Sequence, residues 1–282
     1  MKTILVPTDF SKNSFNAVEY ASAIAKKENA KIILLNAYHY TPPATDIPML
    51  SDIFETMRTA SNERLSALCS EIIKSKKIKC EYISKFDFAV TAIIETSKKE
   101  KADLIVMGTK GASGIKEILM GSNTASVIEK AKCPVIAVPE NAVFSRIKNI
   151  VYASDYHESD IDALRKSVEI AKLFKAKITI LHCSDGEYNR LSEEEYMKSF
   201  ENKVQKKIRY EKMSFKLVYG SFMEGLLQKE IEQSSYDLIA MSTGHRNLFE
   251  KIFGRSVTKK MAFHSEIPLM AFHHKKESVV FI

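Results

Sequence analysis

The feature that most constrains the fold is an internal repeat. Residues 4–9, with the sequence ILVPTD, recur 146 positions later as IVYASD at residues 150–155. The register then holds without a gap from Lys31–Leu35 to Lys177–Leu181. Further along, Asp103–Met107 matches Asp237–Met241 at an offset of 134, so the second copy is twelve residues shorter in between. A repeat of this length predicts two similar domains, which we place at residues 1–146 and 147–282.

Each copy alternates short apolar runs with segments of helical length. Runs rich in Val, Ile and Leu that are separated by helices indicate parallel strands covered on both faces. A doubly wound α/β sheet is therefore predicted for each half. The strands expected in the first copy are Thr3–Pro7, Lys31–Tyr38, Lys79–Phe86, Asp103–Met107 and Pro134–Val138. The stretch that the second copy lacks is expected within Tyr40–Met57, where closely spaced prolines break regular structure.

The first expected helix covers about residues 14–27. Its apolar residues recur at spacings of three and four, which places one apolar face on the sheet. Asp9 and Ser11 precede this helix and are candidates for its N-cap. The residues expected on the apolar face are Phe15, Val18, Ala21, Ile24 and Ala25.

A glycine-rich segment follows the fourth expected strand. Gly108 and Gly111 are followed, nine residues later, by Gly121 and Ser122 at the start of a helix. Glycine lets the main chain turn tightly and lets a ligand approach it closely. A helix N-terminus offers N–H groups and partial positive charge to a phosphate, and the hydroxyls of Ser122 and Thr124 lie at the same end. The segment therefore predicts a phosphate site. Neither GxxxxGK[ST] nor GxGxxG occurs, which argues against a Walker-type NTPase and a dinucleotide-binding enzyme.

The nucleoside end of such a site is expected at the neighbouring strand ends. In an open α/β sheet, ligands bind at the carboxyl ends of strands where the winding reverses. Asp9 follows the first strand and offers a carboxylate to ribose hydroxyls or a cation, and the main chain of Ala37 ends the second strand near a base edge. Taken singly, Asp9 is better explained as a helix cap and Gly121 as an ordinary loop-to-helix junction. Their combination favours a nucleotide.

These residues resemble a known family. The chain looks like a tandem member of the universal stress protein family, whose ATP-binding members carry Gly-x2-Gly-x9-Gly-Ser/Thr, as at Gly108, Gly111, Gly121 and Ser122. The resemblance implies sheets of five parallel strands in the order 3-2-1-4-5, ATP, ADP or AMP in the first domain, and Mg²⁺ as an optional companion. It also implies pairing of the two repeats through their last strands, with a homodimer as a further option. The implied nucleotide-binding residues are Pro7, Thr8, Asp9, Ala37, Met107, Gly108, Gly111, Gly121, Ser122, Asn123 and Thr124.

The second copy departs from the motif. A non-glycine residue in a left-handed conformation costs about 1–2 kcal/mol, and larger side chains would also fill the phosphate volume. We therefore expect that the second domain does not bind ATP in this way. An alternative is that His and Arg form a different anion site there, because Arg binds phosphate through its fork geometry. The replacements are Ser242 for Gly108, His245 for Gly111 and Arg255 for Gly121, while Ser256 keeps the place of Ser122.

Composition narrows the class of protein. The net charge of +7 is not gathered into a Lys/Arg stripe of the kind that nucleic-acid-binding proteins use. The four cysteines lack zinc-like spacing, and we expect Cys80, Cys133 and Cys183 to be buried reduced thiols, which suits the cytoplasm. The N-terminus has no signal-peptide pattern and no apolar run approaches the ~20 residues that span a bilayer. No histidine has metal-site partners, and His182 is expected to be partly buried and hydrogen-bonded.

Three functions follow from these features. The first is a stress-response binding module in which the first domain holds the nucleotide and another protein reads the occupied state. The second is a slow ATPase, although Asp9 should lie toward the sugar and Lys110 is not a Walker lysine. The third is a nucleotide-independent scaffold or chaperone-like protein. We favour the first, with no catalytic residue and no metal ligand.

Overall fold

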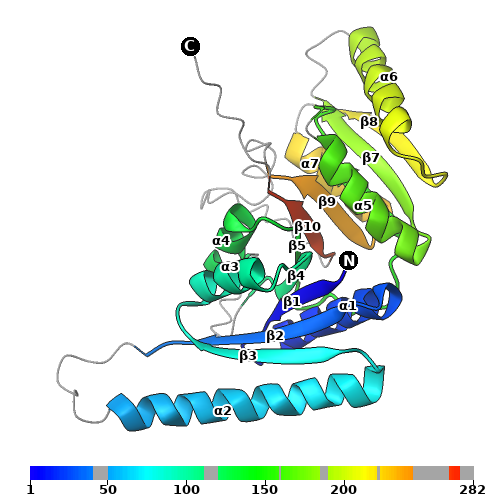
Figure 1. The fold of residues 1–282 in the computed structure, drawn as a ribbon. Helices are drawn as coiled ribbons and strands as arrows, with labels where there is room; N and C mark the ends of the chain where they lie inside the picture. Colours follow the sequence, from blue (N-terminus) through cyan, green and yellow to red (C-terminus); the bar gives the residue numbers. More distant parts are fainter. Residues whose placement is uncertain are drawn as a thin grey trace, which may run out of the picture. The chain divides into compact units, whose positions relative to one another are not determined.

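The computed structural model describes residues 1–40, 50–110, 120–158, 160–184, 190–220, 223–243 and 267–273. The chain divides into two compact units, Met1–Phe144 (unit 1) and Ser145–Ile282 (unit 2) (Figure 1). Both units are α/β.

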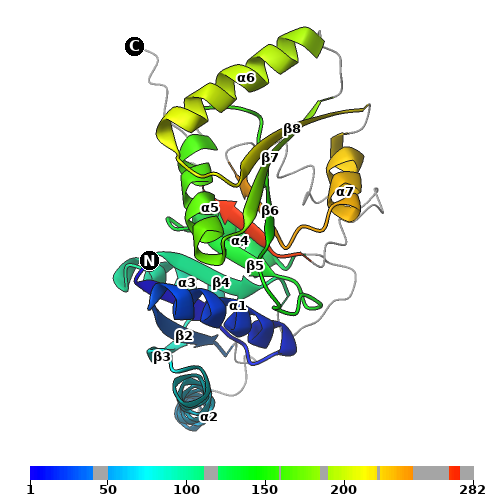
Figure 2. The same ribbon diagram turned by 90° about the vertical axis from the view of Figure 1, so that its right-hand side faces the viewer.

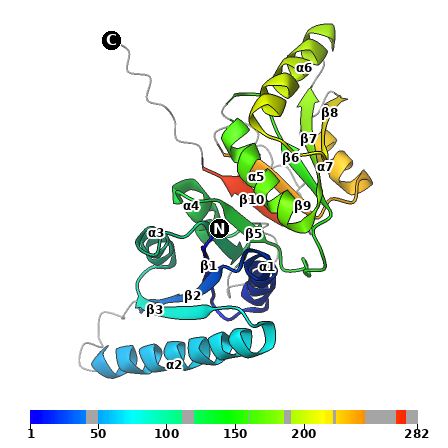
Figure 3. The same cartoon turned by 45° about the vertical axis from the view of Figure 1, so that its right-hand side comes forward.

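Unit 1 alternates strands and helices along the chain. The strands pair in parallel in the order β3-β2-β1-β4-β5, which confirms the predicted order 3-2-1-4-5. Each strand begins and ends within one residue of its predicted position. Helix α1 lies on one side of the strands, α3 and α4 lie on the other, and α2 runs along β3 (Figure 3). The elements are β1 (Thr3–Pro7), α1 (Lys12–Glu28), β2 (Lys31–Tyr38), α2 (Leu50–Glu71) with a π-helical continuation (Ile72–Lys76), β3 (Cys80–Phe86), α3 (Ala89–Lys99), β4 (Leu104–Gly108), α4 (Ser122–Lys130) and β5 (Val135–Val138).

The central strands are buried on both faces, as their continuous apolar runs require. Every residue of β4 and β5 is buried, as are the three middle residues of β1. Helix α1 buries Val18, Ala21, Ile24 and Ala25 as predicted. The prediction for Phe15 is wrong, because its side chain is 42% exposed. The helix begins at Lys12, two residues earlier than expected, and its buried arc includes polar residues of the first turn, so Phe15 lies past the edge of that arc.

Unit 2 repeats the arrangement. Its strands pair in parallel in the order β8-β7-β6-β9-β10, again 3-2-1-4-5 when counted from its own first strand. Helices α5 and α6 lie on one side of the strands and α7 on the other (Figure 2). The counterpart of α4 would fall within residues 244–266, outside the described residues. The elements are β6 (Asn149–Ala153), α5 (Asp160–Phe174), β7 (Lys177–Ser184), α6 (Arg190–Lys207), β8 (Met213–Tyr219), α7 (Met223–Gln233), β9 (Leu238–Ser242) and β10 (Leu269–Phe272).

The difference in length between the units lies between their second and third strands. In unit 1 the helical segment there has 22 residues in α2 and 5 more in its π-helical continuation, against 18 residues in α6. The predicted position, Tyr40–Met57, includes the first turns of α2. Residues 41–49 of that stretch lie outside the described residues, but the helices alone show that unit 2 has a shorter helix and not merely a shorter loop.

One carboxylate in each unit holds the start of the first strand. Oδ2 of Asp103 accepts hydrogen bonds from the main-chain N–H groups of Lys2 (2.6 Å) and Thr3 (3.0 Å). Asp237 does the same for residues 148 and 149, at 2.7 and 2.8 Å. Burial raises the pKa of Asp103, but the two N–H donors and nearby positive charge outweigh it, so the net pKa lies below its ordinary value. The repeat therefore extends to this pair of hydrogen bonds.

The cysteines follow the predicted pattern only in part. All four are free thiols, as expected. Cys183 is buried, whereas Cys80 and Cys133 are half-buried and correct the expectation of full burial. Cys80 is the first residue of the edge strand β3, and Cys133 comes two residues before β5, so neither lies in the middle of a central strand. Among the helices described, none is long and apolar enough to cross a membrane.

Candidate functional site

The carboxyl ends of β1 and β4 form the fork at which the winding of unit 1 reverses. β1 pairs with β2 on one side and with β4 on the other, with Ile4 opposite Leu104. From β1 the chain winds outward to β2 and β3, and from β4 it winds to β5. Ligands of open α/β sheets bind at such a switch point. The fold therefore brings Pro7 and Thr8 to the same edge as Met107 and Gly108.

A chain of hydrogen bonds fixes the turn after β1 against β2. Nδ2 of Asn36 donates to the carbonyl of Thr8 at 2.7 Å, and the hydroxyl of Ser61 on α2 donates to Oδ1 of Asn36 at 2.8 Å. The hydroxyl of Ser84 donates in turn to that of Ser61, also at 2.8 Å. The N–H of Thr8 donates to the carbonyl of Leu35 at 2.8 Å. These contacts place the end of β2, and with it Ala37, beside the turn.

Asp9 lies inside this turn and does not cap α1. Its Oδ1 accepts from the N–H of Ser11 at 3.0 Å and from the Ser11 hydroxyl at 2.6 Å. Ser11 is the N-cap, and its side chain accepts from the N–H of Ser14 at 3.2 Å. Between them, Phe10 takes a left-handed conformation with φ of 62°. Of the two cap candidates, the structure selects Ser11, and it leaves Asp9 on the β1 side of the fork.

Hydrogen bonds to its main-chain carbonyl groups fix the start of the loop after β4. The hydroxyl of Thr124 donates to the Gly108 carbonyl at 2.9 Å, and the N–H of Gly121 donates to the Thr109 carbonyl at 2.6 Å. Nδ2 of Asn13, in the first turn of α1, donates to the Lys110 carbonyl at 2.9 Å. Three successive carbonyls are thus held by α4, its N-cap and α1. The main chain of residues 108–110 therefore has a fixed course.

Helix α4 begins beside this loop. Its N-cap, Gly121, is extended with φ of −63° and gives no side-chain acceptor to the first N–H groups of the helix. Ser122 and Asn123 are exposed at the helix start, and Thr124 is buried because its hydroxyl is used on the loop. A helix N-terminus without a side-chain cap is a favourable place for an anion.

The glycines of the motif act through their missing Cβ atoms. Neither Gly108 nor Gly121 has a left-handed φ, so the strain argument does not apply to them. A Cβ at Gly121 would lie 3.2 Å from the Thr109 carbonyl oxygen, and one at Gly108 would lie 2.8 Å from Cγ of Asn13. A Cβ would therefore clash with Asn13 at Gly108 and would crowd the Thr109 carbonyl at Gly121.

The structure brings together most of the predicted residues of the site. The residues after β1 and those that end β4 share one edge, and the start of α4 is hydrogen-bonded to the loop after β4. Ala37 is the last residue but one of the adjacent strand β2. Gly111 lies outside the described residues. Sequence reasoning missed Asn13 and Asn36. Asn36 carries a weak signal, as a polar residue directly after the apolar run Ile32–Leu35.

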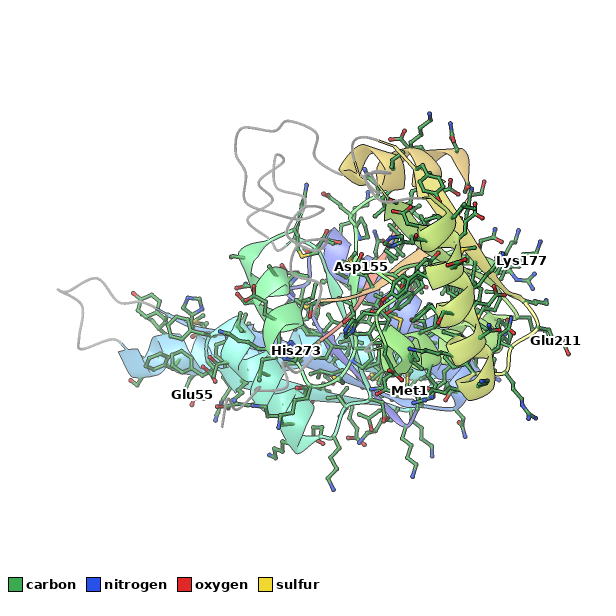
Figure 4. The ribbon with its side chains drawn as sticks, turned by 90° about the horizontal axis from the view of Figure 1, so that it is seen from above. Met1, Glu55, Asp155, Lys177, Glu211 and His273 are labelled. Carbon is green, nitrogen blue, oxygen red and sulfur yellow. The ribbon has the colours of Figure 1, made fainter. Side chains whose placement is uncertain are left out.

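The corresponding edge of unit 2 is built from different side chains. Nδ1 of His182, at the place of Asn36, lies 2.7 Å from the Ser154 carbonyl, which confirms the expectation of a hydrogen-bonded, partly buried histidine. Asp155, labelled in Figure 4, takes the place of Asp9 and lies 4.0 Å from the same ring nitrogen. The ring of Tyr156 stacks on His182 with centroids 4.7 Å apart. Ser242 occupies the place of Gly108 and is buried.

A fully buried carboxylate also distinguishes unit 2. Asp160 begins α5 and accepts from the hydroxyls of Ser154 at 2.7 Å and Tyr152 at 3.2 Å. In unit 1 the equivalent contact joins the hydroxyls of Thr8 and Ser14 at 2.9 Å. Burial raises the pKa of Tyr152 well above its ordinary value, and Asp160 raises it further, so the tyrosine keeps its proton and acts as a donor.

Fold and edge together define a tandem, doubly wound α/β protein in which one repeat has a glycine-lined loop leading to a helix N-terminus. The family model described as the universal stress protein family matches residues 1–139 and again 146–273. The chain therefore belongs to the universal stress protein family, with one family domain in each half.

Individual relatives agree with this assignment. The chain is 32% identical over 142 residues to universal stress protein MJ0531 of Methanocaldococcus jannaschii, a match covering 49% of this chain and 81% of that protein. It is 33% identical over 150 residues to universal stress protein Rv1636 of Mycobacterium tuberculosis, covering 49% of this chain and 95% of that one. A crystal structure of a universal stress protein from Archaeoglobus fulgidus shares the fold over 97% of this chain and 98% of its own, with a TM-score of 0.73 and 22% identity.

Proposed function

We propose that unit 1 binds an adenine nucleotide, ATP or the related ADP or AMP, at the edge formed by β1, β4 and the start of α4. The observation that carries the proposal is the tethering of three successive carbonyls at residues 108–110, which fixes this loop beside a helix N-terminus whose N-cap, Gly121, has no side chain. Phosphate accepts hydrogen bonds from such N–H groups and is favoured by the helix dipole. Gly108, Gly111, Gly121 and Ser122 also match the motif that ATP-binding relatives carry.

The residues on the β1 side suit the nucleoside. The carboxylate of Asp9 is held by Ser11 at the turn, on the far side of the fork from α4, where it would accept from ribose hydroxyls or bind a cation that accompanies the phosphates. The main chain of Ala37 lies at the end of β2, where it would meet a base edge. Because Asp9 would lie at the sugar and not beside the phosphates, we propose a binding role and not turnover.

We further propose that the nucleotide-bound state is read by another protein in a stress response, in the cytoplasm, where the four free thiols would stay reduced. Unit 2 does not take part in this binding mode. Support comes from Ser242, which places a buried side chain where unit 1 has Gly108. The other replacements, His245 and Arg255, lie outside the described residues.

The proposal is tested on the full chain purified without added nucleotide. Denaturation followed by chromatography identifies any copurified adenine nucleotide, and titration calorimetry with ATP, ADP, AMP and GTP gives affinities. In Gly121→Leu the new side chain meets the Thr109 carbonyl, so we expect a loss of affinity of at least about tenfold, or 1.4 kcal/mol. The matched control is Glu129→Leu, which introduces leucine at an exposed position near the other end of α4. This variant should bind the nucleotide as wild type does.

The same measurements separate the alternatives. Phosphate release above background that disappears in Gly121→Leu would favour the slow ATPase. A stably folded wild-type chain that binds none of the adenine nucleotides and shows no thermal shift with ATP would contradict the proposal and favour the scaffold. Equal affinities for Gly121→Leu and Glu129→Leu would place the nucleotide elsewhere.

A further inference from the structure

Asn13 is a polar residue in an unusual position. It lies in the first turn of α1, 97 residues away in sequence from its hydrogen-bond partner, and its side chain points to the loop after β4. The residue is 4% exposed. Its Nδ2 donates to the Lys110 carbonyl at 2.9 Å, whereas its Oδ1 is buried with no hydrogen-bond partner among the described residues.

An unpaired buried oxygen costs stability. A smaller or apolar side chain would avoid that cost, so packing alone does not account for an asparagine here. What the asparagine supplies is a donor for one main-chain carbonyl of the phosphate loop.

The same amide accounts for Gly108. A Cβ on Gly108 would lie 2.8 Å from Cγ, 2.9 Å from Nδ2 and 3.0 Å from Oδ1 of Asn13. Cβ atoms do not approach other atoms this closely, and the amide cannot swing away without releasing Lys110. With no left-handed φ at Gly108, the first glycine of the motif is required by Asn13 and not by its backbone conformation.

The repeat changes both residues together. Asn13 corresponds to Ser159 at the offset of 146, and Gly108 corresponds to Ser242 at the offset of 134 that holds in the later part of the repeat. The shorter side chain at the first position accompanies the larger one at the second. This is the pattern expected if the two residues occupy one shared volume.

We propose that Asn13 is a positioning residue of the nucleotide site: it fixes the phosphate loop through the Lys110 carbonyl and makes glycine obligatory at position 108. This inference rests on the proposed nucleotide binding by unit 1. In unit 2 the sequence has serine at both corresponding positions, Ser159 and Ser242.

The experiment is a double-mutant cycle in the full chain with Asn13→Ser, Gly108→Ser and the two combined, read by thermal unfolding and by ATP titration. Gly108→Ser alone should lower both the midpoint of unfolding and the affinity for ATP. Adding Asn13→Ser should recover most of the lost midpoint because the serine leaves room for the new Cβ. Affinity should stay at least about fivefold below wild type because the Lys110 carbonyl has no donor.

The isosteric change Asn13→Asp separates the donor from the volume. It keeps the shape but turns an acceptor toward the Lys110 carbonyl, so affinity should fall at least about tenfold. Asn16→Asp is the matched control, since Nδ2 of Asn16 on the same helix donates to the Glu140 carbonyl at 2.6 Å, away from the loop. That variant should bind ATP as wild type. A similar loss in Asn13→Ser shows that the missing donor, and not the added charge, is responsible.

The outcomes are distinct. If the wild-type chain binds no nucleotide, the proposed function fails and the positioning role fails with it. If the wild type binds but Asn13→Asp and Asn16→Asp bind equally well, only the positioning role is overturned. If the double variant is no more stable than Gly108→Ser, the shared-volume explanation of Gly108 is wrong.

Discussion

Replacing Asp160 by alanine should selectively destabilise unit 2. The carboxylate is fully buried and accepts from the hydroxyls of Ser154 at 2.7 Å and Tyr152 at 3.2 Å. Leaving a buried donor unpaired costs about 1–3 kcal/mol, so two donors predict a loss of about 2–6 kcal/mol. We expect the lower part of this range because the Tyr152 hydroxyl also lies 3.4 Å from the main-chain oxygen of Asp160.

The assay must report on each unit separately, since two units need not unfold in one step. The chain contains no tryptophan, so native-state hydrogen exchange of peptides from β6 and β7 is more informative than fluorescence. The control is Ser14→Ala in unit 1, which removes two neutral hydrogen bonds of 2.9 Å, one to the Thr8 hydroxyl and one to the Ser11 carbonyl, and should cost about 1–2 kcal/mol. A loss for Asp160→Ala no larger than that of Ser14→Ala would refute the reasoning.

Three further experiments test Asn36, Asp103 and Cys183. Asn36→Ala breaks the bond to the Thr8 carbonyl and should lower stability by about 1–3 kcal/mol in thermal unfolding, whereas Asn36→His, which copies unit 2, should lose less. The pKa of Asp103 in the folded state lies below its ordinary value of 3.8, so this carboxylate contributes fully to the stability of the fold above pH 3.8. The contribution is lost as the pH falls through the folded-state pKa. The free energies of unfolding of wild type and Asp103→Ala, measured by denaturation, should therefore converge at that low pH. Burial raises the pKa of Cys183 to about 12, so iodoacetamide should label it at pH 8 roughly a thousandfold more slowly than in urea, as peptide mapping would show.

Much of the fold could be predicted because its signals are local. The apolar runs that became β1 and β2 have the bounds expected for them, since a strand buried on both faces must be apolar throughout. The repeat carried this assignment into unit 2, where β6 and β7 follow at the same offset. The prediction for Phe15 was wrong because the helical period gives the direction of the apolar face but not the position at which its buried arc ends.

Only the part of the candidate site that belongs to the short glycine motif could be predicted from the sequence. Gly121 and Ser122 predicted the start of a helix, and α4 begins at Ser122. Which of Asp9 and Ser11 would cap α1 was not decidable, because both side chains can accept from the same few N–H groups. The left-handed turn at Phe10 settled it by holding Asp9 on Ser11.

The sequence by itself determined the two repeats, the order in which strands and helices alternate, and the family, because these depend on patterns between neighbouring residues and between the two copies. Only the tertiary structure decided that Asn13 would lie against Gly108 and hold the Lys110 carbonyl. A contact between segments 97 residues apart exists only after the sheet has brought the ends of β1 and β4 together, and no local pattern along the chain encodes the distance between them.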